Sequence, residues 1–263
     1  MLERERKRTI ARLLDLRGFA TIHDIVEATE ASEATIRRDF SEMERDGILA
    51  RVRGGVEMIR GAEPPKSREG EEAARAEPPL DSRLGINQEK KRRIARTACL
   101  GIRPGDTIMI DGGSTTYHMA EYLATMSLTV VTNSFAIAEH LVRHSDCRVI
   151  LPEGVVHPDS RLILNNLGAD PFANYNASAV FMGIEGISVN TLTNSDPLLI
   201  QMERSMIAHS RELVILADDT KFGKTGHLAL CPSERAGRII TTKDADAGIV
   251  AALRDRGIVV ILV

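Results

Sequence analysis

Short runs of apolar residues alternate with amphipathic segments through the C-terminal part of the chain. TIMID, LTVVT, RVILP, ASAVFMG, ELVILAD, GRIITT and IVVILV are continuous apolar runs rich in β-branched residues. Segments with helical periodicity lie between several of them, such as SFAIAEHLVRH, PLLIQMERSMIAHS and DADAGIVAALRDRG. Strands that are apolar on both faces and separated by helices are typical of a parallel sheet covered on both sides. The pattern predicts an α/β domain with a mostly parallel sheet over residues 86–263.

A segment of different composition precedes this domain. Residues 61–85 contain two Pro-Pro pairs, many charged side chains and almost no large apolar ones. Such a segment cannot bury enough apolar surface to fold by itself. We therefore expect a linker over residues 61–85, which divides the 263 residues into a small domain (1–60) and a larger one (86–263).

Residues 1–60 carry the pattern of three helices followed by a β-hairpin. A first apolar stripe ends at Gly18, and a second lies in TIHDIVEATE. The third helix begins after Ser32, a typical N-cap residue, and has apolar residues at positions 36, 40 and 43. Two runs of β-formers, 48–52 and 56–59, then flank a glycine pair. This order predicts a winged helix-turn-helix, whose third helix enters the DNA major groove.

The third helix and the hairpin carry the residues expected to face DNA. If the apolar positions turn inward, Arg38 and Ser41 point outward, and Thr35 and Arg37 lie near the N-terminus of the helix, where base and phosphate contacts are common. The candidate DNA-binding residues are Ser32, Thr35, Arg37, Arg38, Ser41, Arg51 and Arg53. Residues 1–60 contain twelve Lys or Arg and twelve Asp or Glu, so an interaction module with solvated arginines is the alternative.

Composition argues against several classes of protein. A formal net charge of -3 gives no bulk attraction to nucleic acid or to a membrane surface. The apolar runs are far shorter than the ~20 residues of a membrane-spanning helix, and the start MLERERKRTI does not resemble a secretory signal. The three cysteines show neither disulfide nor zinc-site spacing. We expect a cytoplasmic protein with no membrane contact, no cofactor and no metal.

A glycine-rich turn stands between a predicted strand and a predicted helix in IMIDGGSTTYHMAEYL. Successive backbone N–H groups at a helix start suit an anion, although such turns also serve tight packing alone. The turn lacks the lysine and the spacing of a P-loop, so nucleotide hydrolysis is not expected. Because ligands of open parallel sheets bind at the carboxyl ends of strands, we expect a small polar ligand there. The candidates are Asp111, Gly112, Gly113, Ser114, Thr115, Thr116, Asn133, Gly154, Gly183, Glu185 and Lys221.

Motifs in both parts resemble those of the DeoR family of bacterial transcription regulators. The N-terminal part matches S-x-x-T-[IA]-R-R-D and R-x-x-G-G; the C-terminal part matches K-x-x-I-A, G-D-T-I-x-[IL]-D-x-G-[ST]-T, L-T-V-V-T-N-S and A-D-x-[ST]-K-F-G. The resemblance implies a C-terminal domain similar in fold to ribose-5-phosphate isomerase, which binds a phosphorylated sugar or related effector. We expect this domain to self-associate as a dimer or tetramer, because paired winged helices need two-fold symmetry. The resemblance also implies that residues 112–116 and Asn133 hold the phosphate, with Asp111, Glu185 and Lys221 near the sugar. For Asp111 a purely structural role is an equal alternative.

The chain departs from many relatives at three places: Glu153-Gly154, Ile184-Glu185-Gly186, and Glu203, which stands where relatives usually have lysine. An acid in place of a cation opposes an anionic ligand, so we expect the effector to sit or to be charged differently. The segment around Glu203, together with LGINQEKKRRIA and RLILNNLGAD, resembles the branch of the family that contains the ascorbate-utilisation repressor more than the fructose-type regulators.

The resemblance implies a DNA-binding transcription regulator, a repressor of a sugar or sugar-acid catabolic operon, whose operator binding is controlled by a phosphorylated metabolite. We expect no catalysis. The alternative is a sugar-phosphate isomerase, because Asp111, Glu153 and Glu185 are available as bases. A fused DNA-binding module argues against that alternative.

Overall fold

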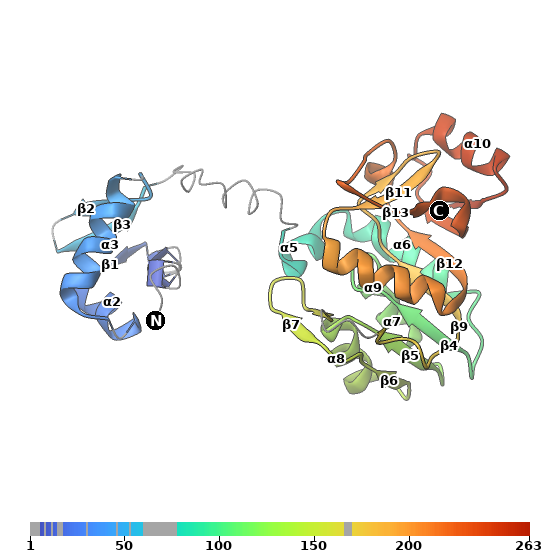
Figure 1. The fold of residues 1–263 in the computed structure, drawn as a ribbon, viewed down its shortest axis with the longest axis horizontal. Helices are drawn as coiled ribbons and strands as arrows, with labels where there is room; N and C mark the ends of the chain where they lie inside the picture. The colour runs from blue at the N-terminus through green and yellow to red at the C-terminus, as the bar shows by residue number, and fades with distance from the viewer. Residues whose placement is uncertain are drawn as a thin grey trace. The chain divides into compact units, whose positions relative to one another are not determined.

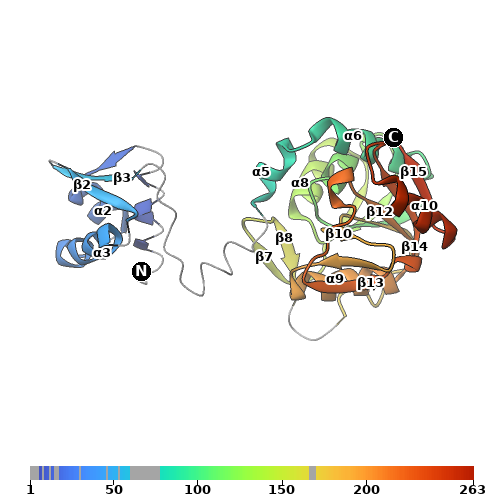
Figure 2. The same cartoon turned by 90° about the horizontal axis from the view of Figure 1, so that it is seen from above.

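The computed structural model describes residues 6–7, 9–11, 13–14, 18–29, 31–45, 47–52, 54–59, 78–165 and 170–263. The chain forms two compact units, Met1–Ala76 and Glu77–Val263, and Figures 1 and 2 show the elements of each. Arg53 and residues 61–77 of the expected linker lie outside the described residues. Among the helices that are described, none has the length and apolarity needed to cross a membrane.

The N-terminal unit contains the predicted helices and hairpin. Helical residues between 6 and 14 are followed by β1 (Phe19–Ala20), α2 (Ile22–Thr29), α3 (Glu33–Arg45), β2 (Leu49–Val52) and β3 (Gly55–Met58). The strands form one antiparallel sheet in the order β1-β3-β2. The helix-turn-helix and the hairpin are confirmed, whereas β1, with only two residues, was not predicted.

Helix α3 is held by its apolar face and by a cap at its start. Ile36, Phe40 and Met43 are buried in one cluster with residues of the first two helices and the sheet. The Ser32 hydroxyl accepts a hydrogen bond from the Thr35 N–H at 3.3 Å, which confirms the predicted N-cap. Asp39, the acid of the R-R-D motif, is buried and paired with Arg6 of the first helix at 2.6 Å. The motif therefore contains one residue that holds α3 in place beside two exposed arginines.

The larger unit is built on one parallel sheet. It contains all of the predicted strands, in the order β15-β14-β12-β9-β4-β5-β6, and every pairing is parallel. The strands are β4 (Thr107–Ile110), β5 (Thr129–Thr132), β6 (Arg148–Ile150), β9 (Ala177–Met182), β12 (Ser210–Leu216), β14 (Ala236–Thr241) and β15 (Val259–Leu262). The α/β prediction is confirmed.

Helices cover both faces of this sheet (Figure 1). One apolar cluster joins the sheet to α6 (Gln88–Cys99), α7 (Met119–Leu123) and α8 (Phe135–His144). A second cluster joins the opposite face to α9 (Pro197–Ala208) and α10 (Ala247–Asp255). Within β4, Ile108 and Ile110 belong to the first cluster and Met109 to the second, as alternating strand side chains require.

Two smaller sheets lie outside the predicted pattern. Strands β7 (Val155–His157) and β8 (Leu162–Leu164) form a hairpin, and β10 (Gly186–Ile187), β11 (Thr191–Asn194) and β13 (Leu228–Pro232) form an antiparallel sheet. The 3-10 helices η1 (Thr116–His118), η2 (Asp219–Lys221) and η3 (Ser233–Arg235) complete the unit. These strands have two to five residues each, so no periodicity marks them.

The expected linker ends earlier than the composition suggested. Residues 80–85, placed in the linker, form helix α5 (Leu80–Gly85). The cause is Leu80, an apolar residue in this charged segment, which is buried against the larger unit. Its N–H also donates a hydrogen bond of 2.9 Å to the Asp159 carbonyl in the β7–β8 turn. The helices of the larger unit therefore begin before residue 86.

The strand order creates a point where the chain reverses direction across the sheet. From β4 the chain adds β5 and β6 on one side, then returns to place β9 on the other side of β4 and continues outward with β12, β14 and β15. Loops leaving β4 and β9 at their carboxyl ends diverge to opposite faces, so a crevice opens between them. The fold therefore predicts a ligand site at the ends of these two strands.

Candidate functional site

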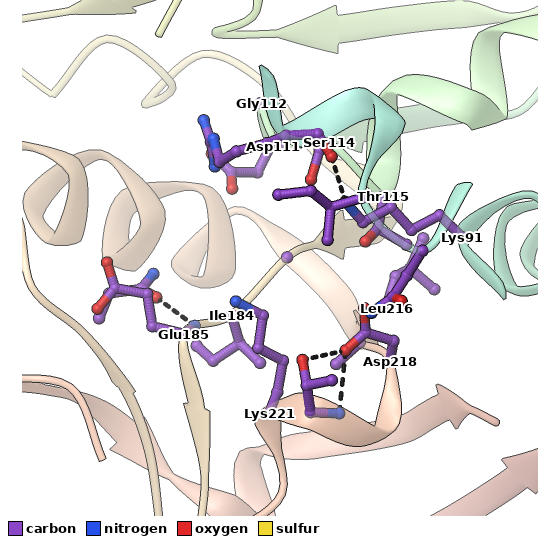
Figure 3. A pocket seen from close by; sticks show the side chains of 18 of the residues that line it. Lys91, Asp111, Gly112, Ser114, Thr115, Ile184, Glu185, Leu216, Asp218 and Lys221 are labelled. Carbon is purple, nitrogen blue, oxygen red and sulfur yellow. Dashed lines mark hydrogen bonds between the residues drawn. The ribbon is translucent and has the colours of Figure 1, made fainter. Parts of the chain in front are cut away.

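A cavity of about 240 Å³ lies at this position (Figure 3). Three of its walls are the segments that follow β4, β9 and β12. Residues from α5, α6, β11 and α9 complete it. The lining residues are Pro78, Arg83, Ile86, Asn87, Lys91, Asp111, Gly112, Gly113, Ser114, Thr115, Gly183, Ile184, Glu185, Asn194, Leu199, Glu203, Leu216, Ala217, Asp218, Thr220 and Lys221.

Most of the residues predicted to bind the ligand line this cavity. They are Asp111, Gly112, Gly113, Ser114, Thr115, Gly183, Glu185 and Lys221. Thr116, Asn133 and Gly154 are not among the lining residues. Thr116 is buried and its hydroxyl donates to the Gly113 carbonyl at 3.0 Å, so it shapes the turn from behind.

Gly154 does not reach the cavity because it follows β6, the edge strand beyond β5. With strands ~4.8 Å apart, the end of β6 is ~10 Å from the end of β4. Gly154 instead begins the β7–β8 hairpin, where its φ is +154° and an added Cβ would lie 2.6 Å from the Leu164 carbonyl oxygen. Close packing in the hairpin explains this glycine.

Asn133 orients two groups of the glycine turn from a fully buried position. Its side-chain oxygen accepts a hydrogen bond from the Gly112 N–H at 2.8 Å. Its side-chain nitrogen donates to the carboxylate of Asp111, also at 2.8 Å. The Asp111 N–H in turn donates to the Phe181 carbonyl on β9 at 2.9 Å. Asp111 thus has a structural partner and also lines the cavity, so the two roles weighed for it are compatible.

A second buried amide organises the opposite wall. The side-chain nitrogen of Asn194 donates to Glu203 at 2.5 Å, and its oxygen accepts from the Glu185 N–H at 2.8 Å. The Ser195 hydroxyl donates to the Glu185 carboxylate. Glu203, with 1% exposure, is a buried acid that fixes the direction of the Asn194 amide. The departure from lysine noted in the sequence therefore lies in the cavity wall.

Sequence reasoning missed the residues that come from α5 and from the start of α6. Lys91 is only 6% exposed, and its ammonium group donates to the Arg83 carbonyl at 2.5 Å. Asn87 has a left-handed backbone, with φ of 53°, and its side chain donates to Asp218 at 3.0 Å. The lysine of the K-x-x-I-A motif was the available signal, but no strand end precedes it, so the strand-end argument passed over it.

The neighbouring lysine lies outside the cavity. Lys90 forms ion pairs with Asp219 at 2.7 Å and Asp244 at 2.8 Å. Its hydrogen bonds to Asp219, the larger cause, and to Asp244 raise the pKa of Lys90 to about 12. Burial alone raises the pKa of Asp219, but hydrogen bonds from Lys90 and Thr242 outweigh it and the net shift is downward. Consecutive lysines of α6 therefore face different surroundings.

The predicted DNA-facing residues lie on and beside α3. Arg37 and Arg38 are exposed, and Arg37 forms an ion pair with Glu33 one turn earlier at 2.6 Å. Ser32 and Thr35 share the N-terminal cap through their hydroxyl groups, which lie 2.8 Å apart. A groove bounded by α2, α3 and the hairpin includes Arg37 in its lining.

Arg51 lies in β2 rather than at the hairpin tip, and its side chain returns to α3. The guanidinium group donates to the Ser41 hydroxyl at 2.6 Å and pairs with Glu44 at 3.0 Å. Ser41 and Arg51 therefore join the hairpin to α3. Within the described residues, no group of three or more His, Cys, Asp or Glu side chains is arranged to hold a metal ion.

Comparison with known protein families identifies both units. Residues 6–61 match the DeoR-like helix-turn-helix domain, and residues 86–243 match the DeoR C terminal sensor domain. The chain belongs to the DeoR family. It is a helix-turn-helix transcription regulator with a C-terminal sensor domain, and this assignment favours a regulator over the isomerase alternative.

Relatives of the same length support the assignment. The HTH-type transcriptional regulator UlaR of Escherichia coli (strain K12 / DH10B) is 26% identical over 263 residues, which cover 100% of both chains. An uncharacterized HTH-type transcriptional regulator of Haemophilus influenzae is 25% identical over 264 residues, covering 100% of this chain and 98% of that protein. The resemblance to the ascorbate-utilisation branch of the family is thereby confirmed.

Solved structures with partial similarity include ribose 5-phosphate isomerases. The enzyme of Methanocaldococcus jannaschii has a TM-score of 0.39 and 16% identity, covering 52% of this chain and 55% of its own. That of Neisseria gonorrhoeae has a TM-score of 0.36 and 18% identity, covering 50% of this chain and 52% of its own. At these scores we base the fold on the sheet topology and draw no functional conclusion from the two enzymes.

Proposed function

We propose that the cavity at the ends of β4 and β9 binds a phosphorylated sugar or sugar acid, and that its occupancy releases a repressor from operator DNA. The observation that carries this proposal is the position of the glycine turn. It lies at the switch point of the sheet and faces a cavity that Lys91, Lys221 and Arg83 also line. Backbone N–H groups and cations together suit a phosphate group.

One backbone N–H of the glycine turn already has a partner within the protein. The Gly112 N–H is occupied by Asn133, so the donors assigned to the ligand are those of residues 113–115 and the two hydroxyl groups among them. Asn133 acts as a positioning residue, because its two hydrogen bonds hold both ends of the Asp111-Gly112 peptide segment. This modifies the sequence expectation, in which Asn133 touched the phosphate itself.

The acids of the cavity suit the other end of such a ligand. Glu185 and Glu203 line the wall opposite the glycine turn, and carboxylates accept hydrogen bonds from sugar hydroxyl groups. Because Glu203 is an acid where relatives usually have lysine, we assign this wall to hydroxyl groups rather than to a second anionic group. A ligand with its single phosphate at the glycine turn and hydroxyl groups toward Glu203 fits both walls.

Thermal shift against a panel of phosphate esters tests the sensor assignment. The panel comprises erythrose 4-phosphate, ribose 5-phosphate, fructose 6-phosphate and 6-phosphogluconate, with inorganic phosphate as the control for the anion alone. We expect at least one ester to stabilise the protein more than inorganic phosphate does, because ligand binding to the folded state adds RT ln(1 + [L]/Kd). No shift with any ester contradicts the assignment.

The repressor assignment also requires a DNA response and the absence of turnover. A duplex selected from a random pool by the protein supplies the operator, and the active ester is expected to lower the affinity of the protein for this duplex.

Regulators that read two half-sites bind as symmetric dimers or larger oligomers, and we propose that the larger unit self-associates. Because its proposed target is operator DNA, we propose that the protein acts in the cytoplasm. Incubation with ribose 5-phosphate is expected to yield no ribulose 5-phosphate, and measurable isomerisation would restore the enzyme alternative.

A further inference from the structure

One wall of the sensor cavity comes from the segment at the start of the larger unit. Residues 78–91, here called the strap, comprise α5 and the first turn of α6 and directly follow residues 61–77. Their lining residues are Pro78, Arg83, Ile86, Asn87 and Lys91. A ligand in the cavity therefore lies against the part of the larger unit from which the chain leads to the DNA-binding unit.

Lys91 is the buried cation among the strap residues that line the cavity. Figure 3 shows its side chain running toward Ser114 and Thr115, while Lys221 rises from the opposite wall beside Ile184. Lys91 is buried and lines the cavity, and its ammonium group carries three donors. One donor holds the Arg83 carbonyl near the C-terminal end of α5 at 2.5 Å.

The other end of α5 is held by the β7–β8 turn. The Leu80 N–H donates to the Asp159 carbonyl at 2.9 Å, and Asp81 pairs with Arg161 at 3.1 Å. The same hairpin reaches the glycine turn from its far side, because the Ile163 N–H donates to the Asn133 carbonyl at 2.7 Å. The C-terminal end of α5 is thus hydrogen-bonded to Lys91, which lines the cavity, and its N-terminal end to the hairpin that contacts Asn133.

We infer that Lys91 binds the anionic group of the sensor ligand together with residues 113–115, and that this contact ties occupancy of the cavity to the docking of α5. The inference rests on the proposed sensor function and names the residue that transmits it. An anion held between Lys91 and the glycine turn adds a contact that exists only when the strap is docked. The ligand must then favour the docked strap, because it shifts the population toward the state it binds better.

The test compares two neighbouring lysines of α6. Lys91→Gln keeps an N–H donor for the Arg83 carbonyl but removes the charge, and Lys91→Met removes both. Lys90→Met is the matched control, because Lys90 pairs with Asp219 and Asp244 and is not a lining residue. Affinity for the most stabilising ester of the panel is measured by calorimetry. Loss of one charge-assisted contact lowers affinity about 10- to 100-fold, which we expect for both Lys91 variants but not for the control.

Hydrogen exchange tests whether occupancy of the cavity is linked to the docking of α5. The active ester is expected to slow exchange of the amides of residues 80–87 in the wild type and in the Lys90 variant, and to leave it unchanged in Lys91→Gln at the same ester concentration. Equal affinity of the Lys91→Gln variant and the wild type overturns the inference. Unchanged exchange over residues 80–87 in the ester-bound wild type overturns the link to α5. If Lys91→Met does not fold, the Gln variant decides. Failure of every ester to bind the wild type instead removes the sensor function, and this inference with it.

Discussion

Replacement of Gly112 by alanine tests whether the glycine turn is set by packing as well as by its backbone donors. A Cβ at this position would lie 2.0 Å from Cδ2 of Leu162 and 3.1 Å from Cβ of Ser134. Leu162 is 5% exposed in the core, and the Ser134 hydroxyl caps α8 through the Ile137 N–H at 3.2 Å. Neither side chain can move away without losing core packing or the cap of α8. Gly112→Ala is therefore expected to lower the free energy of unfolding by ~1–3 kcal/mol, the usual cost of overpacking.

Gly183→Ala is the matched control, because the same change in the same cavity meets no atom within 4 Å. Gly183 also has no left-handed backbone angle, so alanine is compatible there and is expected to be neutral or to stabilise by up to ~1 kcal/mol. Urea unfolding of both variants measures the difference, and in thermal unfolding each kcal/mol corresponds to about 2–4 °C for a domain of this size.

A double-mutant cycle identifies the clash itself. Leu162→Ala alone creates a cavity and is expected to cost ~2–5 kcal/mol. In that background the atom that meets the new Cβ is gone, so adding Gly112→Ala is expected to cost little, which gives a favourable coupling free energy of ~1–3 kcal/mol. Additive costs, or equal stability of the two glycine variants, would refute the packing explanation of the turn.

Three further experiments, two substitutions and one chemical modification, test separate parts of the molecule. Arg38→Ala, at an exposed position of α3, is expected to weaken binding to the selected duplex while the ester-induced thermal shift stays within error of wild type; loss of the shift would mean that the units are not separable in this way. Burial raises the pKa of the Cys99 thiol to about 12. Because the thiolate is the reactive form, iodoacetamide at pH 8 is expected to leave Cys99 unmodified in folded protein and to alkylate it in urea. Rapid alkylation of the native thiol, detected by mass spectrometry, would contradict this. Asp246→Ala removes the α10 N-cap, whose carboxylate accepts from the Ile249 N–H at 2.8 Å, and is expected to cost ~1 kcal/mol in urea unfolding; an unchanged midpoint argues against the cap.

The sequence predicted the central sheet well because its strands are buried on both faces. Continuous apolar runs such as Ala177–Met182 have no other stable environment in a chain of this composition, and each became a strand. Short strands gave no such signal: β10 has two residues, and β11 reads TLTN, in which three of the four side chains are polar. Helix α5 was missed because its stability comes from docking Leu80, a tertiary contact, and not from its own composition.

The lining of the cavity was predicted only where it follows strand ends. Asp111, Glu185 and Lys221 were found because each stands just after a strand of the sheet. Gly154 also stands after a strand, but strand order across the sheet is not visible in the sequence, and β6 lies at the edge. Lys91 belongs to the opposite case: it comes from a helix that packs over the cavity, so its place depends on how α6 docks on the sheet. Local patterns identify strand ends, whereas three-dimensional packing decides which of them meet.

The central claim is that the cavity and α3 are two sites of one switch. Fluorescence anisotropy of the selected duplex, titrated with protein in the absence and presence of the active ester, tests it most directly. We predict that saturating ester lowers the DNA affinity by a factor of about 5–150, and that saturating DNA lowers the ester affinity by the same factor, because coupling between two sites is reciprocal. An ester that binds the protein but leaves the DNA affinity unchanged would contradict the account.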